Sequence, residues 1–170
     1  MKRSLLKICA IALVAILSLG MLVSCNGENG GDTETESKTN IYAVKSGNVT
    51  IELGKKADTV LAKLGEAVSE QNTGNCGGLG ETIRYDYSSA VIVVVDYEDG
   101  DKIIDQIELK NDGAETSMGI YIGSSESSVK AKYGEPDEKV GSALVYTDGD
   151  KRLEIGITDG SVASIVLRCK

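Results

Sequence analysis

The sequence has no histidine among its 170 residues, and this absence limits the chemistry that its other reactive side chains can perform. Ser-His-Asp and Cys-His catalytic sites need a histidine base, and many zinc sites use histidine ligands. These classes of site are therefore excluded. Hydrolysis by paired carboxylates, as in glycoside hydrolases, needs no histidine and stays open, but no pair of acids is distinguished by its spacing.

Three short motifs look like known sites but lack the residues that would complete them. Ser127–Lys130 reads S-x-x-K, the nucleophile motif of penicillin-binding enzymes, without an S-D-N or K-T-G partner. The glycine-rich run 75–80 lacks the Lys-Ser/Thr of a phosphate-binding loop. In the acidic run 96–101, the glycine falls one place early for an EF-hand loop, and weak calcium binding is an alternative that the sequence leaves open. We interpret the three as a polar helix face, a flexible connection and a solvated hairpin, and we predict no cofactor and no metal site.

Tyrosine is the only large aromatic residue, with seven copies and no phenylalanine or tryptophan. Its ring and hydroxyl group supply contact area and hydrogen bonding at low entropic cost, so tyrosine is favoured at binding surfaces. We expect at least half of the tyrosines to fill the core instead. Because side chains alternate along a strand, Tyr85 and Tyr87 should share one face. The candidate binding surface consists of Tyr85, Tyr87, Tyr97 and Tyr121.

The first cysteine beyond the apolar start of the chain, Cys25, ends a recognisable segment. Three basic residues among the first seven precede an apolar run over residues 8–23, which is the order of an export signal and is short for a membrane-spanning helix. The sequence Leu22–Cys25 resembles the lipobox of bacterial lipoproteins, in which the signal is removed before the cysteine and its sulfur receives a diacylglyceryl group. The resemblance implies a signal peptide over residues 1–24 and lipidation of Cys25; an uncleaved membrane anchor is the alternative.

The segment after the lipobox favours a tethered domain. Residues 26–40 contain no large apolar side chain, so they cannot bury enough surface to offset the entropy of ordering. We therefore assign residues 25–40 to a flexible tether. The chain carries a formal net charge of −8, which repels nucleic acid and anionic lipid. We expect no nucleic-acid partner, contact with the membrane through the lipid on Cys25, and a location on the extracytoplasmic side of the cell membrane or outer membrane.

Two cysteines, Cys76 and Cys169, are left once Cys9 is assigned to the signal peptide and Cys25 to the lipid. Disulfides persist outside the cytoplasm, and two cysteines allow a single intramolecular pairing. We predict a disulfide between Cys76 and Cys169, which would tie the end of the chain to its first half. Two independent buried thiols are the alternative.

The secondary-structure elements that would position the candidate binding residues occur twice in the sequence. Residues 51–66 and 120–135 share Ile, Gly, Val, Ala, Lys, Gly and Glu in register, and each block is followed by a tyrosine, Tyr87 or Tyr146, and by apolar strands. Asp-Gly pairs between these strands are strong hairpin signals. The pattern predicts an α+β fold of two tandem units, each a short helical element packed on an antiparallel β-meander.

The boundaries of these units follow from the repeat. We place the first unit at residues 41–113 and the second at residues 114–170. The pattern resembles the β-lactamase inhibitory protein family and the related small outer-membrane assembly lipoproteins. The resemblance to the inhibitory proteins implies two tandem units, each packed on an antiparallel sheet. The best-matching residues are Gly123, Val129, Tyr133, Gly134, Pro136, Tyr146, Gly160, Val162 and Ile165.

These matches are folding signals, and they carry no activity. Tryptophans and phenylalanines line the binding surface of the inhibitors, and this chain has neither, so inhibition of a β-lactamase is poorly supported. We predict a lipid-anchored extracytoplasmic binding module that recognises a protein or a cell-envelope component without catalysis. A structural envelope-assembly lipoprotein and a carboxylate-only hydrolase are the alternatives.

Overall fold

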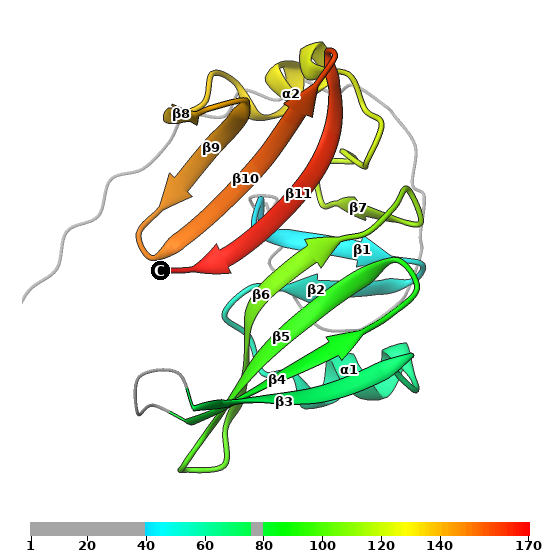
Figure 1. Cartoon of the computed structure of the whole chain (residues 1–170), viewed down its shortest axis with the longest axis vertical. Coiled ribbons are helices and arrows are strands. Elements are labelled where there is room, and N and C mark those ends of the chain that lie inside the picture. The colour runs from blue at the N-terminus through cyan, green and yellow to red at the C-terminus, as the bar shows by residue number, and fades with distance from the viewer. Residues whose placement is uncertain (1–39, 76–79) are drawn as a thin grey trace, which may run out of the picture. The chain divides into compact units, whose positions relative to one another are not determined.

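The structure is a computed structural model, and it describes residues 40–75 and 80–170 (Figure 1). All of these residues belong to one compact unit, Glu36–Lys170. The sequence predictions that lie outside the described residues are the signal peptide, the tether up to residue 39, the lipid attachment at Cys25, and Cys76.

Strands hold 54% of the described residues and helices only 12%, so the fold is mainly β. The strands are β1 (Ala43–Ser46), β2 (Val49–Glu52), β3 (Ser69–Asn75), β4 (Gly80–Asp86), β5 (Ala90–Tyr97), β6 (Lys102–Leu109), β7 (Ala114–Thr116), β8 (Glu138–Val140), β9 (Ala143–Asp148), β10 (Lys151–Thr158) and β11 (Ser161–Cys169). The helices are α1 (Asp58–Leu64), between β2 and β3, and α2 (Glu126–Tyr133), between β7 and β8.

Eight strands form one antiparallel sheet in the order β3-β4-β5-β6-β11-β10-β9-β8. Each half of the chain supplies a four-stranded meander, and the meanders join where β6 pairs with β11, with Ile107 opposite Leu167. The predicted α+β fold of two tandem units, each a helical element on its own meander, is therefore wrong. The physical reason is that the last strand of each meander would otherwise be an edge with unpaired backbone groups, and pairing the two strands satisfies both edges.

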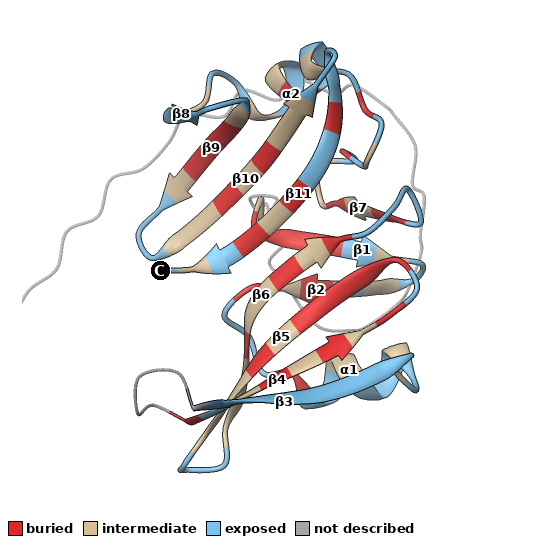
Figure 2. Ribbon diagram, in the orientation of Figure 1, coloured by how far each residue is buried: buried red, intermediate tan, exposed pale blue. Residues whose placement is uncertain are grey.

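A second, three-stranded sheet has the order β2-β1-β7. Its strand β7 belongs to the second half of the sequence and pairs with β1 of the first half, Ala114 opposite Ser46, so the two halves interlock. Both sheets contribute to one hydrophobic core, in which Val44 and Ile51 are buried together with Ile92 and other residues of the large sheet. Buried residues alternate with more exposed ones along β4 and β10 (Figure 2), which leaves one face of the large sheet outside the core.

The helices contribute little to this core, because α1 buries no residue and α2 buries only Val129. Ser125 caps α2 by accepting a hydrogen bond from the Ser128 amide at 3.1 Å, as Ser and Thr caps do, whereas α1 has no side-chain cap. Each helix ends at a glycine with positive φ, Gly65 (77°) and Gly134 (79°). Only glycine adopts this backbone conformation without strain, so the chain can turn sharply into the next strand.

The repeat in the sequence has a counterpart in the backbone contacts. The Gly54 amide donates to the Ile104 carbonyl at 2.8 Å, and the Gly123 amide donates to the Val162 carbonyl at the same distance. The tyrosines of the repeat behave alike: the Tyr87 hydroxyl donates to the Gly65 carbonyl at 3.4 Å, and the Tyr146 hydroxyl donates to the Gly134 carbonyl at 3.1 Å. The same element sequence thus occurs twice, within a single sheet and a single core.

Candidate functional site

The structure separates the four tyrosines of the candidate binding surface. Tyr85 and Tyr87 are each only 9% exposed, and they line the same hollow. Tyr97 lines a different hollow, and Tyr121 is 43% exposed and lines neither. The four residues therefore do not form one surface, but Tyr85 and Tyr87 lie on one side of the sheet, as the alternation of a strand predicts.

The hollow at Tyr85 and Tyr87, called the tyrosine hollow below, has a volume of about 310 Å³. Its lining residues are Leu61, Gly65, Glu66, Ala67, Glu70, Tyr85 and Tyr87. The last turn of α1 forms one wall. The chain turns at Gly65, the Val68 amide donates to the Asp86 carbonyl at 2.7 Å, and β3 then runs beside β4 with Glu70 directly opposite Tyr85.

Both phenols in this hollow are neutral at physiological pH. Burial raises the pKa of Tyr85, and the charge of Glu70 raises it further. Burial likewise raises the pKa of Tyr87, with smaller contributions from Tyr85 and Glu70. The Tyr87 hydroxyl has one long hydrogen bond, to the Gly65 carbonyl, while the Tyr85 hydroxyl has no hydrogen-bond partner among the described residues.

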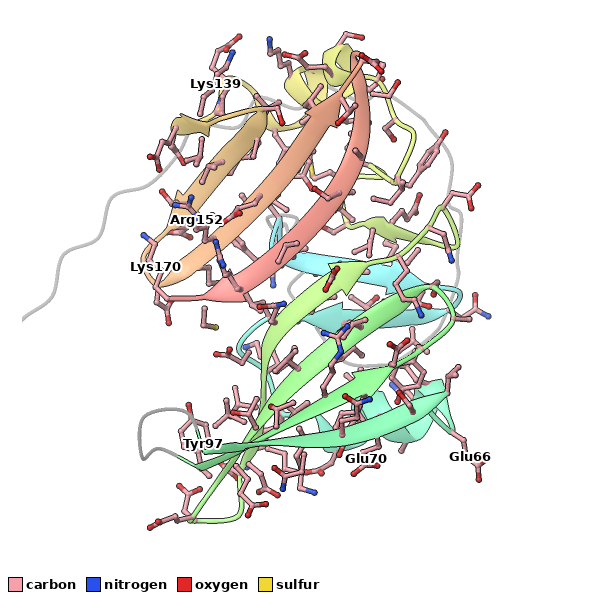
Figure 3. The ribbon with its side chains drawn as sticks, viewed as in Figure 1. Glu66, Glu70, Tyr97, Lys139, Arg152 and Lys170 are labelled. Carbon is pink, nitrogen blue, oxygen red and sulfur yellow. The ribbon has the colours of Figure 1, made fainter. Side chains whose placement is uncertain are left out.

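Two carboxylates lie at the rim of the tyrosine hollow. Glu66 and Glu70 are both exposed, and Figure 3 shows them on the side of the molecule where α1 and β3 lie. Within residues 40–75 and 80–170, neither carboxylate forms a salt bridge. No lysine or arginine is among the lining residues. The hollow therefore combines two buried aromatic rings with uncompensated negative charge.

A second and larger hollow, called the fork below, has a volume of about 450 Å³. It forms because β11 pairs with β6 only from Gln106 to Leu109, and the two strands diverge beyond this segment. The lining residues are Gly54, Thr82, Val95, Tyr97, Ile103, Asp105, Asp150, Cys169 and Lys170; Tyr97 and Lys170 are labelled in Figure 3.

The fork contains a thiol and a perturbed carboxyl group. Burial raises the pKa of the Cys169 thiol, and the charges of Asp105 and Asp150 raise it further, so the thiol stays protonated and is a poor nucleophile. Burial also raises the pKa of Asp105. Cys169 is a free thiol in the structure, and because Cys76 lies outside the described residues, their disulfide stays a prediction.

Two of the three motifs that resembled known sites have ordinary structural roles, and the third, the glycine-rich run 75–80, lies mostly outside the described residues. Ser127 and Ser128 each contact the Ser125 hydroxyl at the start of α2, at 2.9 and 2.8 Å, and Lys130 pairs with Glu126 at 2.8 Å. The hydrogen bond that Lys130 donates to Glu126 raises the pKa of Lys130, which makes it unsuited to act as a base. The S-x-x-K motif is thus the capped first turns of a helix.

The acidic run forms the turn between β5 and β6. Its residue Asp101 pairs with Lys56 at 2.6 Å, and Asp96 pairs with Lys102 at 3.6 Å. No group of three candidate metal ligands occurs among residues 40–75 and 80–170. Neither α1 nor α2, the helices of the described chain, is long and apolar enough to cross a membrane.

Sequence reasoning missed an ordered set of charges on the open face of the large sheet. The cross-strand register places Asp86, Val91, Glu108, Val166, Glu154, Val145 and Glu138 in one row across seven strands. Arginines occupy the adjacent row at Arg84, Arg168 and Arg152. The signal in the sequence was the spacing of two between arginine and acid in Arg84–Asp86 and Arg152–Glu154, but the row itself depends on how β6 pairs with β11.

The charges on this face neutralise one another. Glu154 pairs with Arg152 at 2.6 Å and also with Arg168, while Arg84 lies 4.0 Å from Glu108. Burial acts to raise the pKa of Glu154, but the hydrogen bonds from the two arginines outweigh it and lower the pKa. The open face therefore stabilises the sheet through its own ion pairs, and the tyrosine hollow is the better candidate for a ligand.

No family model and no curated protein matches this chain. Among solved structures, it is similar to a cysteine-rich secretory protein from Staphylococcus aureus, with 13% identity, a TM-score of 0.43, and coverage of 69% of this chain and 44% of that one. It is also similar to a DUF4309 family protein from Bacillus subtilis, with 16% identity, a TM-score of 0.39, and coverage of 70% and 82%. The chain spans less than half of the staphylococcal protein, and likenesses this distant carry no information about function.

Proposed function

We propose that this protein is a lipid-anchored binding module on the extracytoplasmic side of the cell membrane or outer membrane, and that it recognises a protein or a cell-envelope component without catalysis. The observation that carries the binding part of the proposal is the tyrosine hollow, where two nine-tenths buried tyrosines meet two exposed carboxylates. Concave sites with aromatic walls and a few polar groups are the usual form of ligand sites.

The lipobox-like sequence at Cys25 supports the anchoring part of the proposal. As a further part of it, we propose that the repeat is related to those of the β-lactamase inhibitory proteins and the small outer-membrane assembly lipoproteins. Replacement of Cys25 by Ala should abolish lipidation and cleavage, so that the protein is released or accumulates as the longer precursor. Membrane fractionation and intact mass measure this outcome. An unchanged mass and membrane fraction in the Cys25→Ala variant would contradict the anchor.

The binding part is tested by purification of the full chain from the membranes of its own cells. We expect a discrete partner to copurify with the wild-type chain and to be lost from a Glu66→Lys/Glu70→Lys variant, because the variant reverses the charge at the rim of the tyrosine hollow. The matched control is Glu98→Lys/Glu135→Lys, which makes the same change of charge at two exposed acids outside the hollow that form no salt bridge within the described residues. Equal recovery of the partner with both variants would place binding elsewhere on the molecule.

A carboxylate-only hydrolase is the second candidate, and Asp105 is the observation that favours it. The Asp105 carboxyl lines the fork together with Asp150, and its raised pKa is a property of general acids. Under this candidate, a substrate hydrolysed by the wild-type chain should be untouched by an Asp105→Asn variant. Turnover that survives this substitution would remove the candidate.

A further inference from the structure

We propose that the tyrosine hollow binds an alkylammonium group, either on a small molecule or at the end of a lysine side chain. The inference rests on the proposed binding function and names the chemistry of its ligand. It is drawn from the lining of the hollow, from the charge at its rim, and from the equivalent position in the second half of the chain.

The lining suits a cation with an apolar body. Tyr85, Tyr87 and Leu61 are among the lining residues, and an ammonium group is attracted to the electron-rich face of an aromatic ring. The Tyr85 hydroxyl, on a side chain that is 9% exposed, has no hydrogen-bond partner in the described chain. A primary ammonium group that enters the hollow can donate a hydrogen bond to this oxygen.

The charge at the rim selects the sign of the ligand. Glu70 lies directly across from Tyr85 on the neighbouring strand, and Glu66 follows the glycine that ends α1. With no lysine or arginine in the lining, the negative potential of the hollow is not cancelled locally, unlike that of the ion-paired open face. An ammonium group is attracted to this potential, and a carboxylate or phosphate group is repelled by it.

The second half of the chain shows that the fold does not require this hollow. Where Glu70 lies opposite Tyr85, the repeat places Lys139 opposite Leu144, so the acid is replaced by a base and the aromatic ring by an aliphatic side chain. The hollow beside Lys139 and Leu144 is smaller, about 190 Å³, and none of its lining residues is aromatic. The acid and the tyrosine are therefore features of the first half alone, in a fold that accommodates their absence.

The test is a titration of the full chain, kept in detergent, with N-acetyl-lysine methylamide and with choline. N-acetyl-norleucine methylamide, which has the same shape as the lysine probe without the charge, is the ligand control. Calorimetry and tyrosine NMR signals measure binding. We expect millimolar binding of an ammonium probe, weakening with added salt, and no binding of the norleucine compound. Preference for the lysine probe identifies a peptide ligand, and preference for choline identifies a small quaternary amine.

Two substitutions borrowed from the second half test the residues. Glu70→Lys should weaken binding by about tenfold or more, because it turns an attractive charge into a repulsive one. Tyr85→Leu should weaken binding by about fivefold through loss of the aromatic face. Glu135→Lys, an exposed change of equal charge outside the hollow, should leave the affinity unchanged. Circular dichroism and thermal unfolding check that each variant is folded, and Glu70 is exposed, so its variant is expected to fold.

The inference is overturned if neither ammonium probe binds the folded wild-type chain, if the norleucine compound binds equally well, or if Glu70→Lys and Glu135→Lys have the same effect. The failure can be told apart from failure of the proposed function. A copurified partner that is lost with Glu66→Lys/Glu70→Lys, in a protein that binds neither probe, would preserve the binding module and reject the ammonium ligand.

Discussion

At the scale of single residues, two tyrosine hydroxyls close the turns from helix to strand, and they do so with different geometry. The Tyr146 hydroxyl donates to the Gly134 carbonyl at 3.1 Å, and the ring of Tyr146 also packs on Tyr133 with centroids 5.1 Å apart. The Tyr87 hydroxyl reaches the Gly65 carbonyl only at 3.4 Å, which is beyond the usual range for such a bond. The bond in the second half should therefore be the stronger of the two.

Removal of each hydroxyl measures this difference. Tyr146→Phe should lower the free energy of unfolding by about 1 kcal/mol, because it deletes the shorter of the two hydrogen bonds and leaves a carbonyl without this partner. Tyr87→Phe should have less than half of that effect. Urea denaturation of the two variants and the wild-type chain gives the comparison. A larger loss for Tyr87→Phe than for Tyr146→Phe would show that the turns are not ranked by these contacts.

At the scale of elements, the two short helices are held in place by different means. The helix α2 has a serine cap and a buried valine, Val129, while α1 has neither a side-chain cap nor a buried residue. Instead, the residue before α1, Ala57, is fully buried and its amide donates to the Lys102 carbonyl at 2.8 Å. The stability of α2 therefore depends on its cap, and that of α1 depends on its attachment to the start of β6.

The cap of α2 can be removed by one substitution. Ser125→Ala should destabilise the protein by about 1 kcal/mol, because the Ser128 amide loses its acceptor. Ser127→Ala is the control: Ser127 is exposed in the same turn and its hydroxyl contacts the Ser125 hydroxyl at 2.9 Å but accepts from no helix amide, so alanine should cost less there than at the cap. Thermal unfolding of the two variants tests the ranking, and an equal loss for both would show that the cap is not a determinant of stability.

Several local features of these elements could be predicted from the sequence. The Asp-Gly turns depend on neighbouring residues only, and they were correctly expected; the closure of each helix by glycine and the cap of α2 are local in the same way. The shared face of Tyr85 and Tyr87 follows from the alternation of a strand. These features carry no information about distant pairing, so they cannot distinguish two separate meanders from one continuous sheet.

The features that were missed depend on tertiary contacts. The strand β3 has the sequence SEQNTGN, which contains no β-branched aliphatic or aromatic residue and gives no strand signal; it becomes a strand because β4 offers it a partner. Glu70 therefore could not be placed opposite Tyr85, and the tyrosine hollow could not be predicted. Similarly, the alternation of apolar residues in β6 and β11 shows that each has a core face, but it does not show that the two strands pair.

At the scale of the whole described unit, the pairing of β6 with β11 joins the two halves. Ile107 and Leu167 face each other across this pair, and both are fully buried. The three-stranded sheet makes a second connection, because it takes β1 and β2 from the first half and β7 from the second. A structure with two such connections and one core should unfold as a single cooperative unit.

A large-to-small substitution at the junction tests this cooperativity. Leu167→Ala should cost about 3 kcal/mol, as the loss of a buried leucine usually does, and it should accelerate hydrogen exchange equally in β4 of the first half and β9 of the second. Ser164→Ala, at an exposed position of the same strand, should change little. Faster exchange confined to the second half would show that the halves are independent units.

The central claim is that the protein binds a partner through the tyrosine hollow while it is anchored to the membrane, and site-specific photo-crosslinking in intact cells tests it most directly. A benzophenone amino acid is placed at Val68, which is 77% exposed and adjacent to the hollow, or at Val140, which is 50% exposed in the second half. The account predicts a discrete adduct from position 68, none from position 140, and loss of the adduct with Glu70→Lys. Absence of an adduct at position 68, the same adduct from both positions, or an adduct that is insensitive to Glu70→Lys would contradict it.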